Sequence, residues 1–120
     1  MCETRQTSET PLWITPEERC PRGPVALYTT FRAEGACAGA MLEITGLGMF
    51  RAYLNGMRVG EDYLTPGCND YDAYVRVFTY PVSALLRAGE DNLLTVWLGD
   101  GWYRGRYGID KAEASGGCVW

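Results

Sequence analysis

Hydrophobic and polar residues alternate along several short stretches of this chain. Within 49–54, Phe50, Ala52 and Leu54 occupy every second position. A period of two places one apolar row on one face of a β-strand. The pattern therefore predicts a strand over 49–54, followed by a second, short strand at 57–60.

An Asn-Gly pair separates these two runs. Asn55 and Gly56 both tolerate positive φ, and the type I′ turn that they favour has a twist that matches the strands it joins. We therefore expect a β-hairpin over 49–67, with its turn at Asn55-Gly56.

Four further runs have strand character. They predict strands at 25–32, 40–45, 74–80 and 92–98. The loops between the first three strands of the chain are short and leave no room for parallel crossovers. We therefore expect those three strands to form an antiparallel meander.

One segment has the periodicity of a helix instead. In 81–89, Val82, Leu85 and Leu86 recur at i, i+3 and i+4, and Gly89 is placed to end the element. These signals predict one or two helical turns.

The first 24 residues differ from the rest. They begin with a polar stretch and continue with four prolines, which disfavour helix and inner strand. We expect an extended or disordered leader over 1–24, packed by Trp13, and a β-sandwich module over 25–120. Sandwiches of this type have about eight strands, so we expect the module to be truncated at its C-terminal end. An incomplete sandwich leaves open edges and an apolar face, so we also expect poor solubility or oligomers of the isolated chain.

Composition favours one all-β domain. A chain of 120 residues with 15 glycines, eight tyrosines and four tryptophans is rich in turn and strand formers. We predict an antiparallel β-sandwich of jelly-roll type with one short helix. The net charge of −4 leaves no basic face for nucleic acid or an anionic membrane. No apolar run is long enough to span a bilayer.

The cysteines indicate a reducing compartment. There are five of them, an odd number, none spaced as C-x-x-C, and the chain has no histidine. This pattern disfavours a zinc site and favours reduced thiols. The opening residues also lack a signal-peptide core. A cytoplasmic location is therefore predicted.

Three motifs give the chain a resemblance to a known family. They are Tyr53-Leu54-Asn55-Gly56, Leu64-Thr65-Pro66-Gly67 and Gly99-Asp100-Gly101-Trp102-Tyr103. With these motifs, the chain from about Tyr28 to Gly108 resembles the N-terminal β-sandwich module of bacterial α-L-rhamnosidases, a glycoside hydrolase family. One position departs from the family pattern, since Cys68 stands where a tryptophan usually follows Pro-Gly.

The resemblance implies a non-catalytic accessory module of an α-L-rhamnosidase-like enzyme. Its partners would be the catalytic helical-barrel domain of the parent protein and rhamnose-containing glycans. The alternative is a purely structural interdomain module without sugar affinity. A stand-alone glycosidase is a third hypothesis.

Sugar binding requires flat aromatic rings and planar polar groups. The carbohydrate-binding candidates are Asn69, Asp70, Asp72, Asp100, Trp102, Tyr103 and Arg104. Trp97 and Tyr107 are further aromatic candidates, of which Trp97 is expected to be buried. The competing interpretation is that the aromatic residues belong to the core and the carboxylates form turns.

No catalytic residue and no metal ligand are assigned. Glycoside hydrolysis needs two carboxyl groups about 5 to 9.5 Å apart. Asp70 and Asp72 are placed on one side of an extended segment, and Asp62 or Asp100 could join them in space. The resemblance implies that the catalytic carboxylates belong to the barrel domain, which no part of this sequence resembles. Some rhamnosidases have a β-sandwich that binds rhamnose with calcium. Calcium binding by 69–72 therefore stays an alternative, because these residues offer oxygen ligands.

Overall fold

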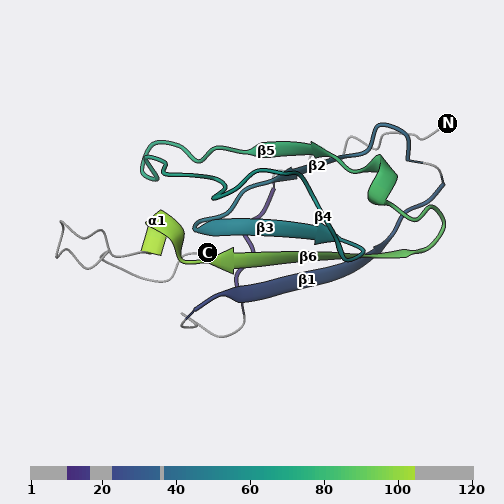
Figure 1. Cartoon of the computed structure of the whole chain (residues 1–120), viewed down its shortest axis with the longest axis horizontal. Helices are drawn as coiled ribbons and strands as arrows, with labels where there is room; N and C mark the ends of the chain where they lie inside the picture. Colours follow the sequence, from purple (N-terminus) through teal and green to yellow (C-terminus); the bar gives the residue numbers. More distant parts are fainter. Residues whose placement is uncertain (1–10, 17–22, 36, 105–120) are drawn as a thin grey trace.

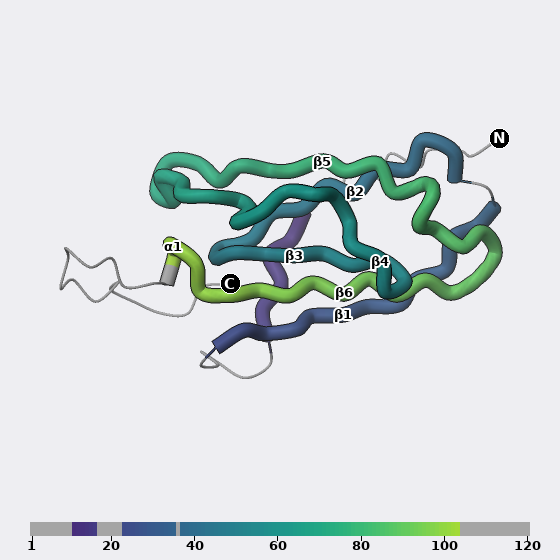
Figure 2. The backbone as a smooth tube through the Cα atoms, in the orientation of Figure 1, coloured from purple at the N-terminus to yellow at the C-terminus, as the bar shows by residue number. Residues whose placement is uncertain are grey.

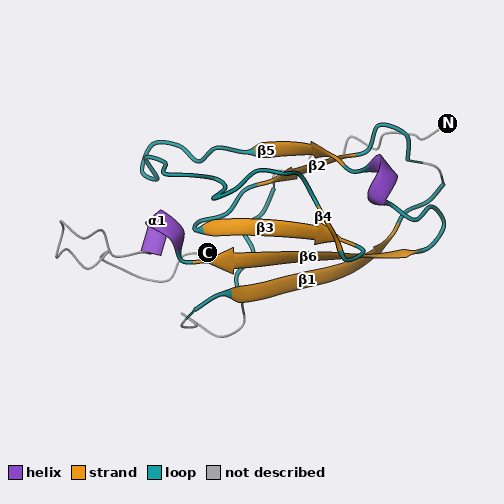
Figure 3. Cartoon of the chain, in the orientation of Figure 1, coloured by secondary structure: helices purple, strands orange, loops and turns teal. Residues whose placement is uncertain are grey.

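The protein is represented by a computed structural model that describes residues 11–16, 23–35 and 37–104. Figures 1 and 3 show its strands and short helical turns. The elements are β1 (Val25–Arg32), β2 (Met41–Ile44), β3 (Met49–Leu54), β4 (Met57–Arg58), β5 (Phe78–Pro81), the 3₁₀ turn η1 (Ser83–Leu85), β6 (Asp91–Gly99) and α1 (Gly101–Arg104).

The strands form two antiparallel sheets. One has four strands in the order β1-β6-β3-β4, and the other pairs β2 with β5. Figure 1 shows the smaller sheet lying over the larger one. The predicted fold class, an all-β sandwich-like architecture, is therefore confirmed.

The core lies between the two sheets. Its buried side chains are Phe50, Ala52, Leu54, Val59, Tyr80, Val82 and Leu98. Three of them are the alternating apolar positions of β3, so the strand's period of two places one row of side chains in the interior. Phe50 contacts Phe78 of β5 edge to face, with ring centroids 6.0 Å apart. This contact joins the two layers at the centre.

The predicted hairpin is present. Asn55 has φ 53° and Gly56 has φ 81°, and the turn brings Tyr53 opposite Arg58 and Leu54 opposite Met57. Positive φ at both central positions is the signature of a type I′ turn.

The expected meander is wrong. β1 pairs with β6 along its whole length, from Val25 opposite Leu98 to Arg32 opposite Asp91. β2 pairs with β5 and lies in the other sheet. The short connection at 45–48 thus joins two layers. A short loop keeps consecutive strands close, but it does not require them to share hydrogen bonds.

β5 is shorter than the predicted strand at 74–80. Its partner β2 has four residues, which pair with Phe78–Pro81 in the register Met41 to Pro81 and Ile44 to Phe78. No strand of the described ranges pairs with residues 74–77, and Tyr74 and Val77 are exposed. The length of the partner therefore limits β5.

The segment 81–89 forms one 3₁₀ turn in place of an α-helix. Leu85 donates its backbone N–H to the Val82 carbonyl at 2.9 Å, which closes the turn. Further winding is prevented because the Asn92 side chain bonds both backbone groups of Arg87, at 2.8 and 3.0 Å. Among the described residues, the α-helical turn is instead α1, which the sequence pattern did not indicate.

Residues 11–16 have no regular secondary structure. Figure 2 shows this segment passing behind β3 and β6. Leu12, Trp13 and Ile14 line an apolar cavity of about 490 Å³ between the sheets, although Trp13 is 56% exposed. None of the helices among the described residues is long and apolar enough to span a bilayer.

Candidate functional site

Two segments far apart in the sequence meet at one end of the sandwich. One is the loop at 61–77, and the other is α1 with the residue before it. Figure 2 shows both at the same end of the backbone. Tyr71 of the loop packs edge to face against Tyr103 of α1, with ring centroids 5.0 Å apart and planes at 67°. We call this region, residues 65–72 and 100–104, the loop end.

The loop is attached to the core strand β3. Thr65 accepts a hydrogen bond from the Phe50 N–H at 2.8 Å, and its hydroxyl donates to the Phe50 carbonyl at 3.0 Å. Thr65 and Pro66 are buried, and the peptide between them is cis. The motif Leu64-Thr65-Pro66-Gly67 thus fixes the start of the loop end against the sheet.

Asn69 is the most buried of the candidate residues, with 8% of its surface exposed. Within the part of the chain that the structure describes, neither its Nδ2 nor its Oδ1 makes a hydrogen bond of standard geometry. Tyr71 lies beside it and donates its hydroxyl to the Gly67 carbonyl at 3.3 Å. Burial raises the pKa of the Tyr71 phenol, Cys68 raises it further, and the neighbouring Asn69 amide lowers it. The loop end therefore contains a buried amide with unused hydrogen-bonding capacity.

Asp70 and Asp72 point into solvent. The Asp70 carbonyl accepts the N–H groups of Ala73 and Tyr74 at 2.9 and 2.8 Å, so this stretch is a turn, as the structural interpretation expected. Across the described ranges, no three histidine, cysteine, aspartate or glutamate residues gather as a metal would require. Calcium binding by 69–72 therefore stays a prediction, and no cluster of acidic side chains among the described residues supports it.

The remaining candidates lie at the end of β6 and in α1. Asp100 is half-buried between these two elements, and Trp102 and Tyr103 are half-buried in α1. Arg104 ends α1, and its side chain falls outside the described part, as does Tyr107. The structure thus brings Tyr103 against the loop through Tyr71, a residue that sequence reasoning did not select. The signal that could have identified Tyr71 is its place between two candidate residues.

Trp97 is not buried, contrary to expectation. It is 49% exposed, because its neighbours Val96 and Leu98 face the sandwich interior and strand alternation directs Trp97 to the opposite side. Cys68, which follows Pro66 and Gly67, is exposed and forms no disulfide.

The comparisons with known proteins agree on one family. Residues 35–117 match the family described as Alpha-L-rhamnosidase N-terminal domain. A curated α-L-rhamnosidase of Alteromonas sp. strain LOR is 34% identical over 94 residues, which are 78% of this chain and 10% of the relative.

Solved structures of the same kind of enzyme are similar in fold. The native α-L-rhamnosidase from Aspergillus terreus superimposes with a TM-score of 0.69 and 34% identity, over 83% of this chain and 11% of that one. The Streptomyces avermitilis α-L-rhamnosidase complexed with L-rhamnose gives a TM-score of 0.68 and 39% identity, over 72% of this chain and 8% of that one. The chain therefore spans about a tenth of the length of the relatives it matches.

Proposed function

Because this chain belongs to the α-L-rhamnosidase N-terminal domain family, we propose that it is a non-catalytic accessory module of a larger α-L-rhamnosidase-like glycoside hydrolase. In this proposal the loop end docks onto the catalytic domain and contacts the rhamnoside substrate beside it. The described residues offer a half-buried aromatic pair and an amide at this end, and they offer no gathered acidic cluster.

The observation that supports docking most directly is the state of Asn69. A buried amide left without partners costs about 1 to 3 kcal/mol, and most such groups in folded proteins find a partner. Asn69 is 8% exposed, and among the described residues neither of its amide atoms makes a hydrogen bond of standard geometry. A neighbouring domain or its bound water can supply the missing donor and acceptor.

The alternative, a purely structural module without sugar affinity, is also supported by an observation. Trp102 and Tyr103 are half-buried, and Tyr103 directs its ring against Tyr71. A ring engaged in this way presents less flat surface to a sugar. Docking and sugar contact are therefore separable parts of the proposal.

The substitution Asn69→Leu distinguishes docking from sugar contact, because leucine is similar in size to asparagine and its side chain has no polar atoms. In the isolated chain we expect Asn69→Leu to be neutral or stabilising, since an unpaired amide is removed. In a longer polypeptide that includes the catalytic domain, the same substitution should remove the docking contact. We therefore expect the module of that variant to melt separately from the catalytic domain. Thr30→Val, at an exposed position of β1, is the matched control and should change neither melting profile.

Kinetics of the longer polypeptide separate substrate contact from docking. A raised KM at unchanged melting indicates that Asn69 contacts the rhamnoside. An Asn69→Leu variant that destabilises the isolated chain by several kcal/mol would show that the amide is satisfied internally, and the docking proposal would then be wrong.

The non-catalytic role has its own test. The isolated 120-residue chain should not hydrolyse an aryl α-L-rhamnoside above background, whereas the longer polypeptide should. Hydrolysis by the isolated chain would favour the third hypothesis, a stand-alone glycosidase.

Two further predictions remain proposals. We infer that the module continues past residue 120, and one supporting observation is Phe31, which lies on the interior side of β1 and is still 40% exposed. The cytoplasmic location is supported by the exposed, unpaired thiol of Cys68. Fractionation of the source cells would test the location.

A further inference from the structure

A second polar and aromatic surface adjoins the loop end and extends along the outer face of the four-stranded sheet. It is a groove of about 400 Å³ near the ends of β3 and β6. Among the residues that line it are Arg51, Tyr53, Asp62, Leu64 and Trp97. Of these, only Trp97 was named as an aromatic candidate from the sequence, where it was expected to be buried.

The wall of the groove is a tryptophan beside an arginine. Trp97 and Arg51 occupy directly paired positions of β6 and β3. Both lie on the side of the sheet opposite the buried Phe50 and Leu98. Residues paired in this way have Cβ atoms about 5 Å apart, so the two side chains start from adjacent positions on this face. The Arg51 guanidinium lies over the Tyr63 ring, 5.8 Å from its centroid. Trp97 is 49% exposed, so part of its ring is open to a ligand.

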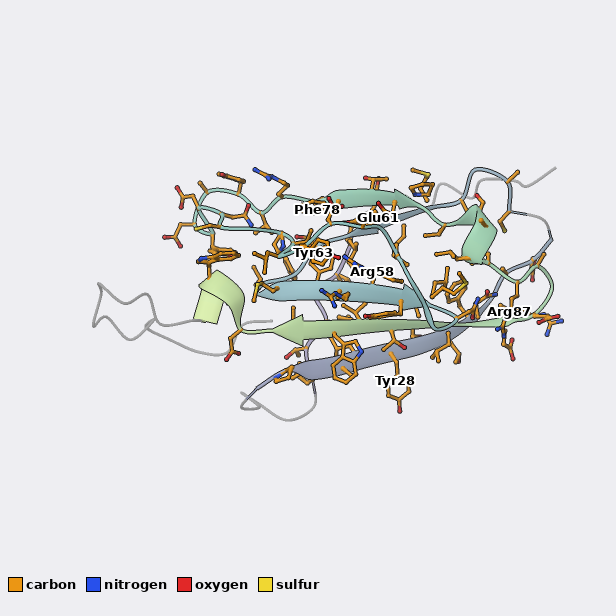
Figure 4. All side chains as sticks on the ribbon, in the orientation of Figure 1. Tyr28, Arg58, Glu61, Tyr63, Phe78 and Arg87 are labelled. Atoms are coloured by element: carbon orange, nitrogen blue, oxygen red, sulfur yellow. The ribbon has the colours of Figure 1, made fainter. Side chains whose placement is uncertain are left out.

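The carboxylate of the groove is held in place by neighbours. Asp62 accepts a hydrogen bond from the Tyr80 hydroxyl on Oδ2 at 2.9 Å, and its carbonyl accepts one from Arg58 Nη2 at 2.6 Å. Arg58 also lies over the Tyr63 ring, 4.6 Å from its centroid. Figure 4 shows Arg58 and Tyr63 next to each other above β3. The loop that carries Asp62 is therefore ordered before any ligand arrives.

We propose that this groove binds a pyranose ring of an uncharged glycan. The exposed Trp97 ring would stack on the apolar face of the sugar, Arg51 would donate to its hydroxyls, and Asp62 would accept from them. This combination of one flat aromatic surface with an opposed donor and acceptor suits neighbouring hydroxyl groups. The positive charge of Arg51 and the negative charge of Asp62 also offset each other, so the groove has no electrostatic preference for a charged ligand.

The size of the groove agrees with such a ligand. Small-molecule sites have volumes of about 300 to 1,000 Å³, and this groove is at the small end of that range. The inference does not depend on the function proposed for the loop end, since none of the groove residues belongs to it.

The test is a titration of the folded chain with methyl α-L-rhamnopyranoside and, separately, methyl α-D-mannopyranoside, followed by NMR. Folding of each sample is verified first by cooperative melting. Where the isolated chain does not melt cooperatively, the longer polypeptide takes its place. We expect a dissociation constant of about 1 mM for at least one sugar, as for a single stacked ring in a wet site.

Four variants assign the site. Trp97→Ala should weaken binding at least about tenfold, and Asp62→Asn about threefold or more. Trp97→Phe keeps an aromatic face and should retain most of the affinity, which controls for misfolding of the alanine variant. Tyr28→Ala is the matched control, because Tyr28 is an exposed aromatic residue of the same face, extends away from β1 in Figure 4 and does not line the groove.

Three results would overturn the proposal. The first is no binding of either sugar at tens of millimolar to a folded sample. The second is equal affinity of Trp97→Ala and the parent chain. The third is protection of Trp97 from acrylamide quenching in the longer polypeptide without sugar, because that would identify the groove as a contact between domains.

Discussion

The side chain of Asn55, in the turn between β3 and β4, donates a hydrogen bond from Nδ2 to Oδ1 of Asn92 at 2.8 Å. The same Nδ2 group donates to the Leu85 carbonyl at 2.8 Å, and Asn55 Oδ1 accepts the Leu93 N–H at 3.0 Å. Asn92 is fully buried and bonds the backbone of Arg87 as well. These two amides therefore join the hairpin turn, η1 and the start of β6.

Replacing Asn92 should be among the most damaging substitutions in the chain. Asn92→Ala leaves several buried backbone and side-chain groups unpaired, each costing about 1 to 3 kcal/mol. We expect a loss of about 3 kcal/mol or more in the free energy of unfolding, measured by urea denaturation. A loss below about 1 kcal/mol would show that water replaces the amide.

Asn55 adopts the positive φ of the turn and also forms side-chain hydrogen bonds, and Asn55→Gly separates these two roles. Glycine keeps the positive φ of the turn, so only the side-chain hydrogen bonds are removed. We expect Asn55→Gly to cost about 1 to 2 kcal/mol and Asn55→Gly with Asn92→Ala to be less damaging than the sum of the two. Additive losses would contradict a shared network.

The hairpin could be predicted from Asn55 and Gly56 because turn chemistry is local. The role of Asn92 could not be predicted from the sequence, because it depends on which strand pairs with β3. The same limit explains the failed meander, since β6 comes long after β3 in the sequence, with Leu94 paired to Leu54, and yet lies between β1 and β3. The alternation of residues along β6 correctly assigns Trp97 to the face opposite Val96 and Leu98. Trp97 was nevertheless predicted to be buried, because large aromatic residues usually are, and that prediction was wrong.

The candidate site was predicted only in part. The loop and the GDGWY motif were selected as polar and aromatic segments, and the structure brings both to one end. Contact between Tyr71 and Tyr103 depends on how the loop folds back over the end of β6, and no local pattern in either segment encodes that path. The groove at Trp97 was missed for the same reason, because its residues come from three separate segments.

A third prediction concerns the close passage of the chain at Gly48. A Cβ atom there would lie 2.2 Å from the Gly99 carbonyl oxygen, and the residue has φ 136°. Gly48→Ala should therefore push β3 away from β6 and cost well over 2 kcal/mol, since backbone cannot yield as a flexible side chain can.

Gly56 provides the matched control. It also has positive φ, at 81°, but nothing lies within 4 Å of its Cβ position. Gly56→Ala should cost only the left-handed backbone strain of about 1 to 2 kcal/mol. Thermal denaturation of both variants measures the difference. Equal losses would mean that strain alone, and not contact with Gly99, determines the effect at Gly48.

The Tyr80 hydroxyl makes the stability of the folded chain depend on pH in the alkaline range. Burial and the hydrogen bond to Asp62 raise the pKa of Tyr80 to about 12 from the ordinary value of 10.0. The folded chain thus keeps a proton that the unfolded chain loses, so stability is fully present below pH 10 and falls as pH rises from about 10 to about 12.

Tyr80→Phe tests this dependence, because it removes the titrating group and keeps the ring. At pH 7 the variant should be less stable by about 1 kcal/mol through the lost hydrogen bond. The difference should shrink as pH rises above 10, as measured by urea denaturation at several pH values. A constant difference between the two proteins from pH 7 to 11 would contradict the raised pKa.

The last prediction concerns whether the loop end is preorganised. Tyr71 and Tyr103 are in contact at 5.0 Å across two segments, and aromatic pairs of this geometry contribute about 0.5 to 1.5 kcal/mol beyond their buried area. A double-mutant cycle with Tyr71→Leu and Tyr103→Leu should therefore give a coupling energy in that range. Tyr71→Phe is the control, since it keeps the ring and removes only the long hydrogen bond to Gly67. A coupling energy near zero would mean that α1 and the loop move independently, and a site built from both segments would then have to be assembled by its partner.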